Sequence, residues 1–472
     1  MAFEAPANNA RSDARLLVIR IGTALIAIVL LLMPALWNRF PLLEYDTGGY
    51  LARWFEGYLV PSRSTVYGLF LTAGWPFDFW PVVLLQAAAT VWVMALVFRT
   101  HGFGQRPFAF LLVITLLSAT TALSWNASML LTDIFAALGV LAFHLLVFKS
   151  DRLEHWERFT LVGFIAFAAA THSATFLVVL GLSVITILAS FIDRTWVPRF
   201  AAIRGGIAVV LGAVMLLTAN YLVAKRIAWT PGGYGIVFAR MLEDGIVARY
   251  LQEHCADRRF KLCPYRRELP ATADEFLWGE SVFDKLGRFD GLGDEMRTIV
   301  LESLLAYPLT QIETALAAAA KQLIKVRTGE GVIPEVWHTY GMMEMYAPSV
   351  LPAMRAARQQ RGELHFAAIN AVHVPIAFAG MIFLPVLMLL GLRRRSYGDL
   401  GLLATTAALA IVMNAFVCGP LSNAHDRYGA RIVWLAPFVI ALVPLRRIAL
   451  AADTHAQSQG AKPMKPGPVA PA

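Results

Sequence analysis

Long runs of apolar residues, separated by short polar connections, dominate the hydrophobic pattern of this chain. A helix that crosses about 30 Å of hydrocarbon needs roughly 20 mostly apolar residues. Ten stretches follow this pattern: 15–36, 80–98, 107–124, 129–148, 159–171, 174–192, 203–224, 371–392, 399–417 and 431–446. The fifth is short, and the break at Thr171-His172-Ser173 could be a bend within one helix. We therefore expect an all-α polytopic membrane protein with about ten transmembrane helices.

The orientation of these helices follows from lysine and arginine in the short connections. Basic residues precede the first run and follow the second, fourth, sixth, eighth and tenth: Arg11, Arg15, Arg99, Arg106, Lys149, Arg152, Arg158, Arg194, Arg199, Arg204, Arg393, Arg394, Arg395, Arg446 and Arg447. The connections at 125–128 and 171–173 contain neither residue type. Both termini are therefore expected in the cytoplasm. The long first run, without a clear cleavage site, predicts a signal anchor.

The pattern divides the chain into five segments. A cytoplasmic N-terminus at 1–14 precedes a transmembrane module at 15–225, whose first outer loop spans 37–79. Residues 226–370 mix a polar helical pattern with Pro and Gly breaks, which predicts a small helical extracytoplasmic domain resting on the membrane. C-terminal transmembrane helices occupy 371–446. The Pro-, Ala- and Gly-rich tail at 447–472 is expected to be a disordered cytoplasmic segment.

Two local features of the outer segments also allow a prediction. Cys255 and Cys263 both lie in the long outer segment, where an oxidising compartment would permit a disulfide between them; the sequence leaves open whether they are bonded. In the first outer loop, residues 50–59 alternate apolar side chains with Arg53 and Glu56. This pattern predicts an amphipathic helix lying flat at the membrane interface, with its aromatic face in lipid.

The composition excludes several classes of protein. Hydrophobic residues make up 58% of the chain and charged residues 15%, with a mean hydropathy of +0.59. Soluble domains carry roughly 25% charged residues, so an ordinary soluble enzyme, a disordered chain and a small disulfide-rich secreted domain are excluded. The sequence also lacks a P-loop, a dinucleotide-binding glycine motif, a zinc-protease motif, a nucleophile elbow and a basic patch interleaved with aromatics.

Polar and ionisable side chains collect at the outer ends of the predicted spans. Groups of this kind beside a membrane are costly and usually functional. Four separate stretches contribute them: Glu44 and Asp46 after the first run, Asp133 in the fourth, His172 after the fifth, and His425, Asp426, Arg427 and Tyr428 before the tenth. We therefore expect these residues to line one shared site at the outer face.

Structural roles would explain the same residues without a site. Asp46 could cap the helix that begins at Thr47, and Asp133 could sit at a helix N-terminus whose dipole favours an anion. His172 could be a hydrogen-bond donor at a helix end. Arg427 could be an interfacial residue that reaches toward water.

Two lysines of the long outer segment are further candidates. Lys321 and Lys325 are four residues apart, and so lie on one face of a predicted helix, where they could provide the counter-charge for a phosphate. A solvated face or contact with lipid headgroups explains them equally well. No D-x-D pair follows the first run, so the sequence requires no metal, although Glu44 and Asp46 could share a Mg²⁺ or Mn²⁺ ion.

The layout resembles the GT-C superfamily of membrane glycosyltransferases, and within it the protein O-mannosyltransferases and aminoarabinose-transferase-like enzymes. The resemblance is carried by an acidic residue in the first outer loop, Asp46, by YGLFLTAGWP at 67–76, by VVLLQAAATVWVMALVF at 82–98 and by the Arg427-Tyr428 pair. It covers mainly residues 15–225 and 399–446, and the segment 226–370 matches no part of it. The acidic pair common in the family is absent, and His172 stands where a basic residue is usual.

The resemblance implies a transferase that uses a polyprenyl-phosphate-linked sugar. Asp46 would be the general base, with Asp133 as a second catalytic carboxylate, and a single displacement would invert the anomeric centre. Arg427, with Lys321 or Lys325, would stabilise the departing phosphate. The acceptor would be a lipid, protein or glycan. The family and the short loops favour a bacterial inner membrane, with the site facing the periplasm.

Three other functions compete with this hypothesis. A transporter or flippase would need charged or broken helices near the bilayer midplane in matching halves, whereas the span interiors are nearly free of charge and no internal repeat is evident. A surface-glycan ligase or polymerase would share the outer site and the lipid-linked donor but move a larger glycan. A non-catalytic scaffold would use the large loop to bind a partner.

Overall fold

The computed structural model describes residues 6–192 and 197–460, with side chains from 14 to 452. Its secondary structure in these ranges is helical, apart from one isolated bridge between Leu42 and Met129. The helices are α1 (Pro6–Asn38), α2 (Thr47–Glu56), α3 (Thr65–Thr72), α4 (Trp80–Thr100), α5 (Pro107–Thr120), α6 (Leu123–Ala127), α7 (Asp133–Phe148), α8 (His155–Thr171), α9 (Ser173–Ile192), α10 (Arg199–Ala224), α11 (Gly233–Glu243), α12 (Ile246–His254), α13 (Ala273–Trp278), α14 (Val282–Lys285), α15 (Arg288–Ala306), α16 (Pro308–Ile324), α17 (Trp337–Tyr346), α18 (Leu351–Arg355), α19 (Phe366–Arg393), α20 (Gly398–Leu421), α21 (Asp426–Val433) and α22 (Leu435–Gly460).

Seven helical segments among the described residues are long and apolar enough to cross a membrane. They are Ala14–Asn38, Trp80–Thr100, Ser173–Ile192, Arg199–Ala224, Phe366–Arg393, Arg395–Leu421 and Asp426–Ala452. The all-helical architecture predicted from the sequence is thus observed, with seven segments of spanning length where ten were expected. The other three expected spans correspond to the shorter helices α5, α7 and α8.

Three boundaries differ from the sequence prediction. The run at 107–124 divides into α5 and α6, because Thr121 has an extended backbone. His172 is likewise extended, with φ −156° and ψ 130°, so α8 and α9 are separate helices and not one bent helix. At the C-terminus, α22 continues to Gly460, so residues 447–460 are helical where disorder was expected. Residues 461–472 of that tail lie outside the described residues.

The bundle is held together by close approaches between its inner helices. Gly212 of α10 lies against α8, where a side chain would meet the Ala166 carbonyl oxygen at 2.8 Å. Gly205 lies two turns earlier on α10, and a side chain there would likewise meet the ring of Phe143. Small residues at such crossings let helix backbones pack closely. As a result α7 is almost entirely buried, and its N-terminal end with Asp133 is fixed inside the bundle.

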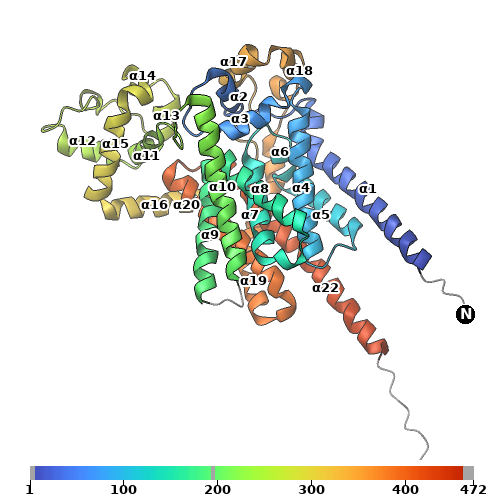
Figure 1. Ribbon diagram of the computed structural model, residues 1–472. Helices are drawn as coiled ribbons and strands as arrows, with labels where there is room; N and C mark the ends of the chain where they lie inside the picture. Colours follow the sequence, from blue (N-terminus) through green and yellow to red (C-terminus); the bar gives the residue numbers. More distant parts are fainter. Residues whose placement is uncertain (1–5, 193–196, 461–472) are drawn as a thin grey trace, which may run out of the picture.

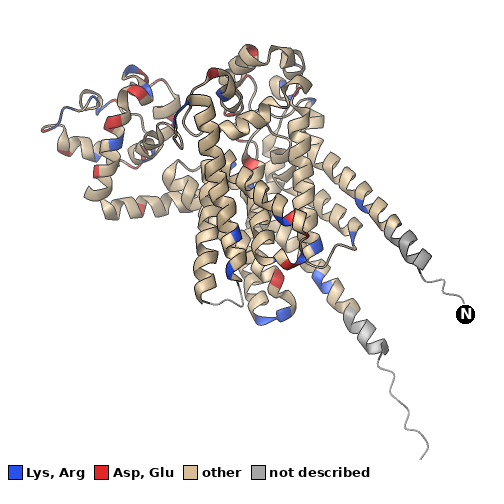
Figure 2. Cartoon of the chain, viewed as in Figure 1, with Lys and Arg blue, Asp and Glu red and all other residues tan. Residues whose placement is uncertain are grey.

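Charged pairs mark one end of the bundle. Asp399 accepts a hydrogen bond from Arg446 at 2.6 Å and lies 3.6 Å from the Lys149 ammonium. Arg99 pairs with Glu157 at 2.5 Å. In Figure 2, several Lys and Arg positions of the bundle lie at its lower end, the end toward which the start of α1 and the end of α22 also point (Figure 1), while others lie in the lobe at the left. The alternation of basic connections in the sequence therefore corresponds to a common end of the fold.

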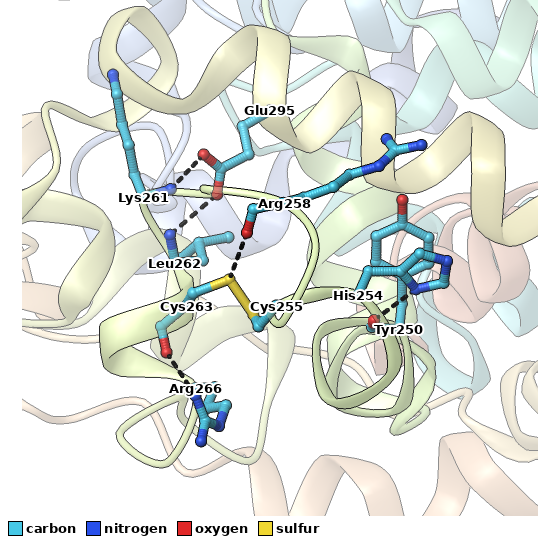
Figure 3. Close-up of a disulfide and its surroundings, with 9 residues drawn as sticks. All are labelled: Tyr250, His254, Cys255, Arg258, Lys261, Leu262, Cys263, Arg266 and Glu295. Carbon is cyan, nitrogen blue, oxygen red and sulfur yellow. Dashed lines mark hydrogen bonds between the residues drawn. A yellow bond between two sulfur atoms is a disulfide. The ribbon is translucent and has the colours of Figure 1, made fainter.

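The helices α11–α15 form a separate lobe beside the upper part of the bundle, called the outer lobe below (Figure 1). Their own core contains Phe238, Tyr250, Phe276, Phe283 and Met296, all buried. Figure 3 shows the disulfide between Cys255 and Cys263 at its edge, which confirms that the two cysteines are bonded. Next to it, the Glu295 carboxylate accepts hydrogen bonds from the backbone N–H groups of Lys261 and Leu262. The disulfide and this carboxylate hold the irregular segment that follows α12.

The rest of the long outer segment belongs to the bundle. Met343, Val350 and Met354, from α17 to α18, are buried in the same core as the membrane helices. Helix α17 covers α2, and Phe55 of α2 stacks on Tyr346 at a centroid distance of 4.9 Å. The prediction that this amphipathic helix lies with its aromatic face in lipid was therefore wrong, because a segment about 290 residues later packs on it.

Candidate functional site

A short backbone contact brings the first outer loop to the start of α7. Leu42 N–H donates to the Ser128 carbonyl and the Leu42 carbonyl accepts from Leu130 N–H, both at 2.9 Å. The Thr47 hydroxyl then donates to the Leu130 carbonyl at 3.0 Å. Since Glu44 and Asp46 come just after the first of these segments and Asp133 just after the second, the contact places three carboxylates together.

Arg427 lies at the centre of these carboxylates. It is the second residue of α21, and its guanidinium contacts Glu44 Oε1 at 2.5 Å, Asp46 Oδ2 at 3.1 Å and Asp133 Oδ2 at 3.6 Å. The Tyr428 ring lies 5.0 Å from the same guanidinium. A buried arginine of this kind needs its charge balanced by acidic groups, so the first outer loop, α7 and α21 are linked through one side chain.

Two further arginines complete the cluster. Arg63 forms an ion pair with the other oxygen of Asp46, Oδ1, and lies over the ring of Tyr50. Arg431, one helical turn beyond Arg427, is fully buried; it lies 3.6 Å from Asp133 Oδ1 and 3.4 Å from His172 Nδ1. The buried cluster thus contains three carboxylates and three guanidinium groups, and their formal charges balance.

The amide of Asn414 fixes the innermost arginine. Its Oδ1 accepts a hydrogen bond from Arg431 Nη2 at 2.7 Å, and its Nδ2 donates to the Tyr428 carbonyl at 2.7 Å. By contrast, both Asp133 oxygens are buried with no hydrogen-bond partner among the described residues, and their ion pairs of 3.6 Å are longer than hydrogen bonds. Asp133 therefore provides negative charge more than directed hydrogen bonding.

The two carboxylates of the first outer loop titrate differently. Burial raises the pKa of Glu44 to about 7, aided by the charge of Asp46 and opposed by Arg427. For Asp46, burial also favours the neutral form, but the charges of Arg63 and Arg427 outweigh it and hold its pKa below the ordinary range. Asp46 is therefore the ionised base of the pair, while Glu44 can gain or lose a proton near neutral pH.

The backbone around Glu44 is held by α17 and by the loop between α16 and α17. The Thr339 hydroxyl donates to the Glu44 carbonyl at 2.9 Å and accepts from Gly48 N–H at 3.0 Å. Gly331, at φ +78°, lies against the Glu44 carboxylate, where a side chain would come within 2.3 Å of Oε1. Only glycine suits both this conformation and this contact.

His425 lies one step outside the cluster. Its Nδ1 is 2.9 Å from Glu330 Oε1 and its Nε2 is 3.4 Å from Asp274 Oδ2 of the outer lobe. The other oxygen of Glu330 accepts a hydrogen bond from Arg427 N–H at 2.8 Å. Although burial lowers it, the two carboxylates raise the pKa of His425 to about 9. His425 thus connects the outer lobe to the backbone of Arg427.

The structure brings together most of the residues expected at the shared site. Glu44, Asp46, Asp133, His172 and Arg427 meet in the cluster, and Tyr428 borders it. The two lysines do not join it. Lys321 is exposed and lies 3.6 Å from Glu243 of the outer lobe, and the charge of Lys325 contributes to lowering the pKa of Asp274, also in that lobe. Lys321 points toward the outer lobe, and Lys325 lies just past the end of α16 with an extended backbone, so the two do not line the site from one helix face as predicted.

Three members of the site were not expected from the sequence: Arg63, Arg431 and Glu330. Arg63 follows α2 in an irregular segment, PSRS, that offers no periodicity. Arg431 is the first residue of the apolar run at 431–446, so the sequence indicated only a residue at the boundary of a span. Its spacing of four from Arg427 nevertheless places both arginines on one helix face. Glu330 lies between Gly329 and Gly331, which both have positive φ. In the sequence, the two flanking glycines were the available sign of an unusual turn.

A recess leads from the surface to the edge of the cluster. Arg63 and His172 line it together with Ser64, Asn220 and Trp229. It has room for little more than a water molecule. No three acidic, histidine or cysteine side chains in the described ranges are arranged to hold a metal ion; the carboxylates of the cluster face guanidinium groups, an arrangement that does not fit the Mg²⁺ or Mn²⁺ ion considered from the sequence.

Comparisons with known family models, with curated proteins and with solved structures find no match to this chain.

Proposed function

We propose that this chain is an integral-membrane glycosyltransferase that moves a sugar from a polyprenyl-phosphate-linked donor to an acceptor on the extracytoplasmic face. The observation that carries the proposal is the contact of one carboxylate, Asp46, with two guanidinium groups, Arg63 and Arg427, beside a surface recess. A carboxylate can take a proton from a hydroxyl nucleophile, and guanidinium groups suit a departing phosphate.

The membrane topology in this proposal has ten crossings. To the seven segments of spanning length we add α5, α7 and α8, which pack inside or against the bundle. Because α7 is almost completely buried among other helices, its short length does not have to match the thickness of the hydrocarbon layer. The basic end of the bundle then faces the cytoplasm. The cluster and the outer lobe face the periplasm of a bacterial inner membrane, where lipid-linked donors are presented. The arrangement is GT-C-like.

The reaction in this proposal is a single displacement. The acceptor O–H gives its proton to the Asp46 carboxylate while its oxygen forms a bond to the anomeric carbon. The bond from that carbon to the phosphate oxygen breaks on the opposite side, and its electron pair stays on the polyprenyl phosphate. Arg63 and Arg427 stabilise the negative charge of this leaving group. The anomeric configuration is inverted.

Donor binding would also activate the base. In the structure Arg63 and Arg427 both pair with Asp46, which lowers its pKa and weakens it as a base. A phosphate that attracts these guanidinium groups would relieve Asp46 of part of their charge, and its pKa would rise. Glu44, with a pKa of about 7, can take up a proton and so offset the added negative charge. Arg431 and Asp133 remain as the fixed part of the site.

A transfer assay tests the proposal. The purified chain in vesicles is offered a panel of polyprenyl-phosphate sugars, hexoses and pentoses, with lipid, peptide and glycan acceptors. The proposal expects release of polyprenyl phosphate from at least one donor, with formation of a product of opposite anomeric configuration. Absence of release across a panel that a known transferase of this donor class processes would contradict it.

A further inference from the structure

The helix α16 exposes a row of large apolar side chains. Leu309, Ile312 and Leu316 are 80%, 58% and 53% exposed, and their spacing of three and four places them on one face. Leu305, at the adjoining end of α15, is 84% exposed. Single exposed leucines need no explanation, but a contiguous row marks a surface that something covers.

The other faces of α16 are already occupied. Ala318, Ala319 and Gln322 are buried against α20 and α21. Lys321, on a third side, reaches Glu243 of the outer lobe at 3.6 Å. Glu313 is exposed at the edge of the apolar row. The helix therefore has a protein-facing side, a polar side and an uncovered apolar side.

The crossing point of α16 with α20 fixes its level. Gly419 of α20 touches the Ala318 backbone so closely that a side chain would meet its carbonyl oxygen at 2.5 Å. At about 1.5 Å per residue, Gly419 lies roughly 30 Å along the helix from Asp399, which pairs with Arg446 and Lys149 at the basic end. This matches the hydrocarbon thickness of about 30 Å. Figure 1 shows α16 running across the bundle axis at this outer end of α20.

We propose that α16 is an in-plane membrane helix whose apolar face, Leu309, Ile312 and Leu316, lies in the outer leaflet of the bilayer. Its occupant is bulk lipid, because the spanning helix on which α16 packs also exposes apolar side chains within two turns of the crossing at Gly419, where Val412 and Phe416 are 42% and 45% exposed. A row of apolar residues with a polar edge is the pattern of helices that lie at this boundary.

The membrane contact would extend to the candidate site. At the end of α16, the Gln322 amide is fully engaged with the backbone of His425: its Nε2 donates to the carbonyl at 2.8 Å, and its Oε1 accepts from the N–H at 3.0 Å. His425 is two residues from Arg427. A helix anchored in lipid would thus fix the level of the site relative to the bilayer, whatever reaction the site performs.

Spin labels measure the depth of α16 in the full-length chain in phospholipid vesicles. Single cysteines replace Leu309, Ile312 or Leu316, with Phe383 of the spanning helix α19 as the lipid-exposed reference and Asp294 of the outer lobe as the water-exposed reference. The native cysteines offer little competition, because Cys255 and Cys263 are bonded and Cys418 is buried. The readout is the ratio of collision rates with oxygen and with a water-soluble nickel complex.

The proposal expects the three α16 positions to show ratios well above that of Asp294, up to that of Phe383, which lies deeper along its spanning helix. Ratios equal to that of Asp294 would overturn it, since the face would then be in water. Protection from both quenchers, or coupling between labels on two chains, would also overturn it, because a protein surface would then cover the helix. The unlabelled parent chain and the retained disulfide serve as checks of folding.

Discussion

Arg427 Nη2 lies 3.1 Å from Asp46 Oδ2, although the two residues are 381 positions apart in the chain. One comes from the first outer loop and the other from the start of α21, just before a C-terminal span. Because the same guanidinium also reaches Glu44 and Asp133, it joins segments from the first third and the last tenth of the sequence. In our account this contact is what a donor phosphate would loosen.

Arginine substitutions test the phosphate role. Arg427→Ala and Arg63→Ala should each raise the KM for donor roughly 10- to 100-fold, as expected for loss of a charge-assisted hydrogen bond. Arg267→Ala, an exposed arginine of the outer lobe, is the matched control and should leave KM unchanged. Since Arg427 also balances buried carboxylates, Arg63→Ala is the cleaner variant. An unchanged donor KM in Arg63→Ala would remove it from phosphate binding.

The titration of Glu44 predicts a feature of the pH–rate profile. With a pKa of about 7, this carboxyl group changes its charge within the neutral range. We expect the donor KM to rise with pH through about 7, because ionised Glu44 competes with the phosphate for Arg427. In Glu44→Gln the inflection should vanish while transfer persists. If the inflection remains, another group is responsible.

The raised pKa of His425 predicts how the outer lobe responds to alkaline pH. Its ordinary value is 6.5, and in the fold it is about 9. The stabilisation from its contacts with Glu330 and Asp274 is thus complete below about 6.5 and is lost as pH rises through about 9. Limited proteolysis of the outer lobe should accelerate over this interval. His425→Gln should be more susceptible at pH 6.5 and show little further change, whereas a parallel pH response in both chains would contradict this explanation.

The orientation of the bundle can be tested in intact cells. Cysteine at Arg267 in the outer lobe should react with a membrane-impermeant maleimide, and cysteine at Glu154, in the connection before α8, should react only after the membrane is opened. Both positions are exposed, so accessibility to water is matched. Labelling of Glu154→Cys from outside would reverse the assignment of the faces.

The sequence predicted the shared site through a single property, the position of polar residues at alternate ends of apolar runs. That reasoning found Asp46, Asp133, His172 and Arg427, because the side to which a helix end belongs follows from counting spans. It could not find Arg63, whose position depends on the turn after α2. It also missed the role of Arg431, which lies one turn after Arg427 on α21 and reaches Asp133 and His172 from there.

Errors arose where a helix had two plausible neighbours. The spacing of Lys321 and Lys325 predicted one shared helix face, but α16 ends at Ile324, so Lys325 lies past the helix, and Lys321 contacts the outer lobe and not the cluster. The amphipathic pattern at 50–59 correctly predicted a helix, yet α17 covers what lipid was expected to cover. Periodicity identifies which face of a helix is apolar, while the identity of the covering partner depends on tertiary contacts from distant segments.

Sugar transfer by Asp46→Asn is the measurement that tests the proposed mechanism most directly. The substitution keeps the shape of the side chain and removes the base, and Asp290→Asn, an exposed carboxyl group of the outer lobe, controls for charge loss. Our account predicts that Asp46→Asn lowers the transfer rate by roughly 100-fold or more, with normal membrane yield, while Asp290→Asn matches the parent chain. Transfer by Asp46→Asn at the parent rate would contradict it.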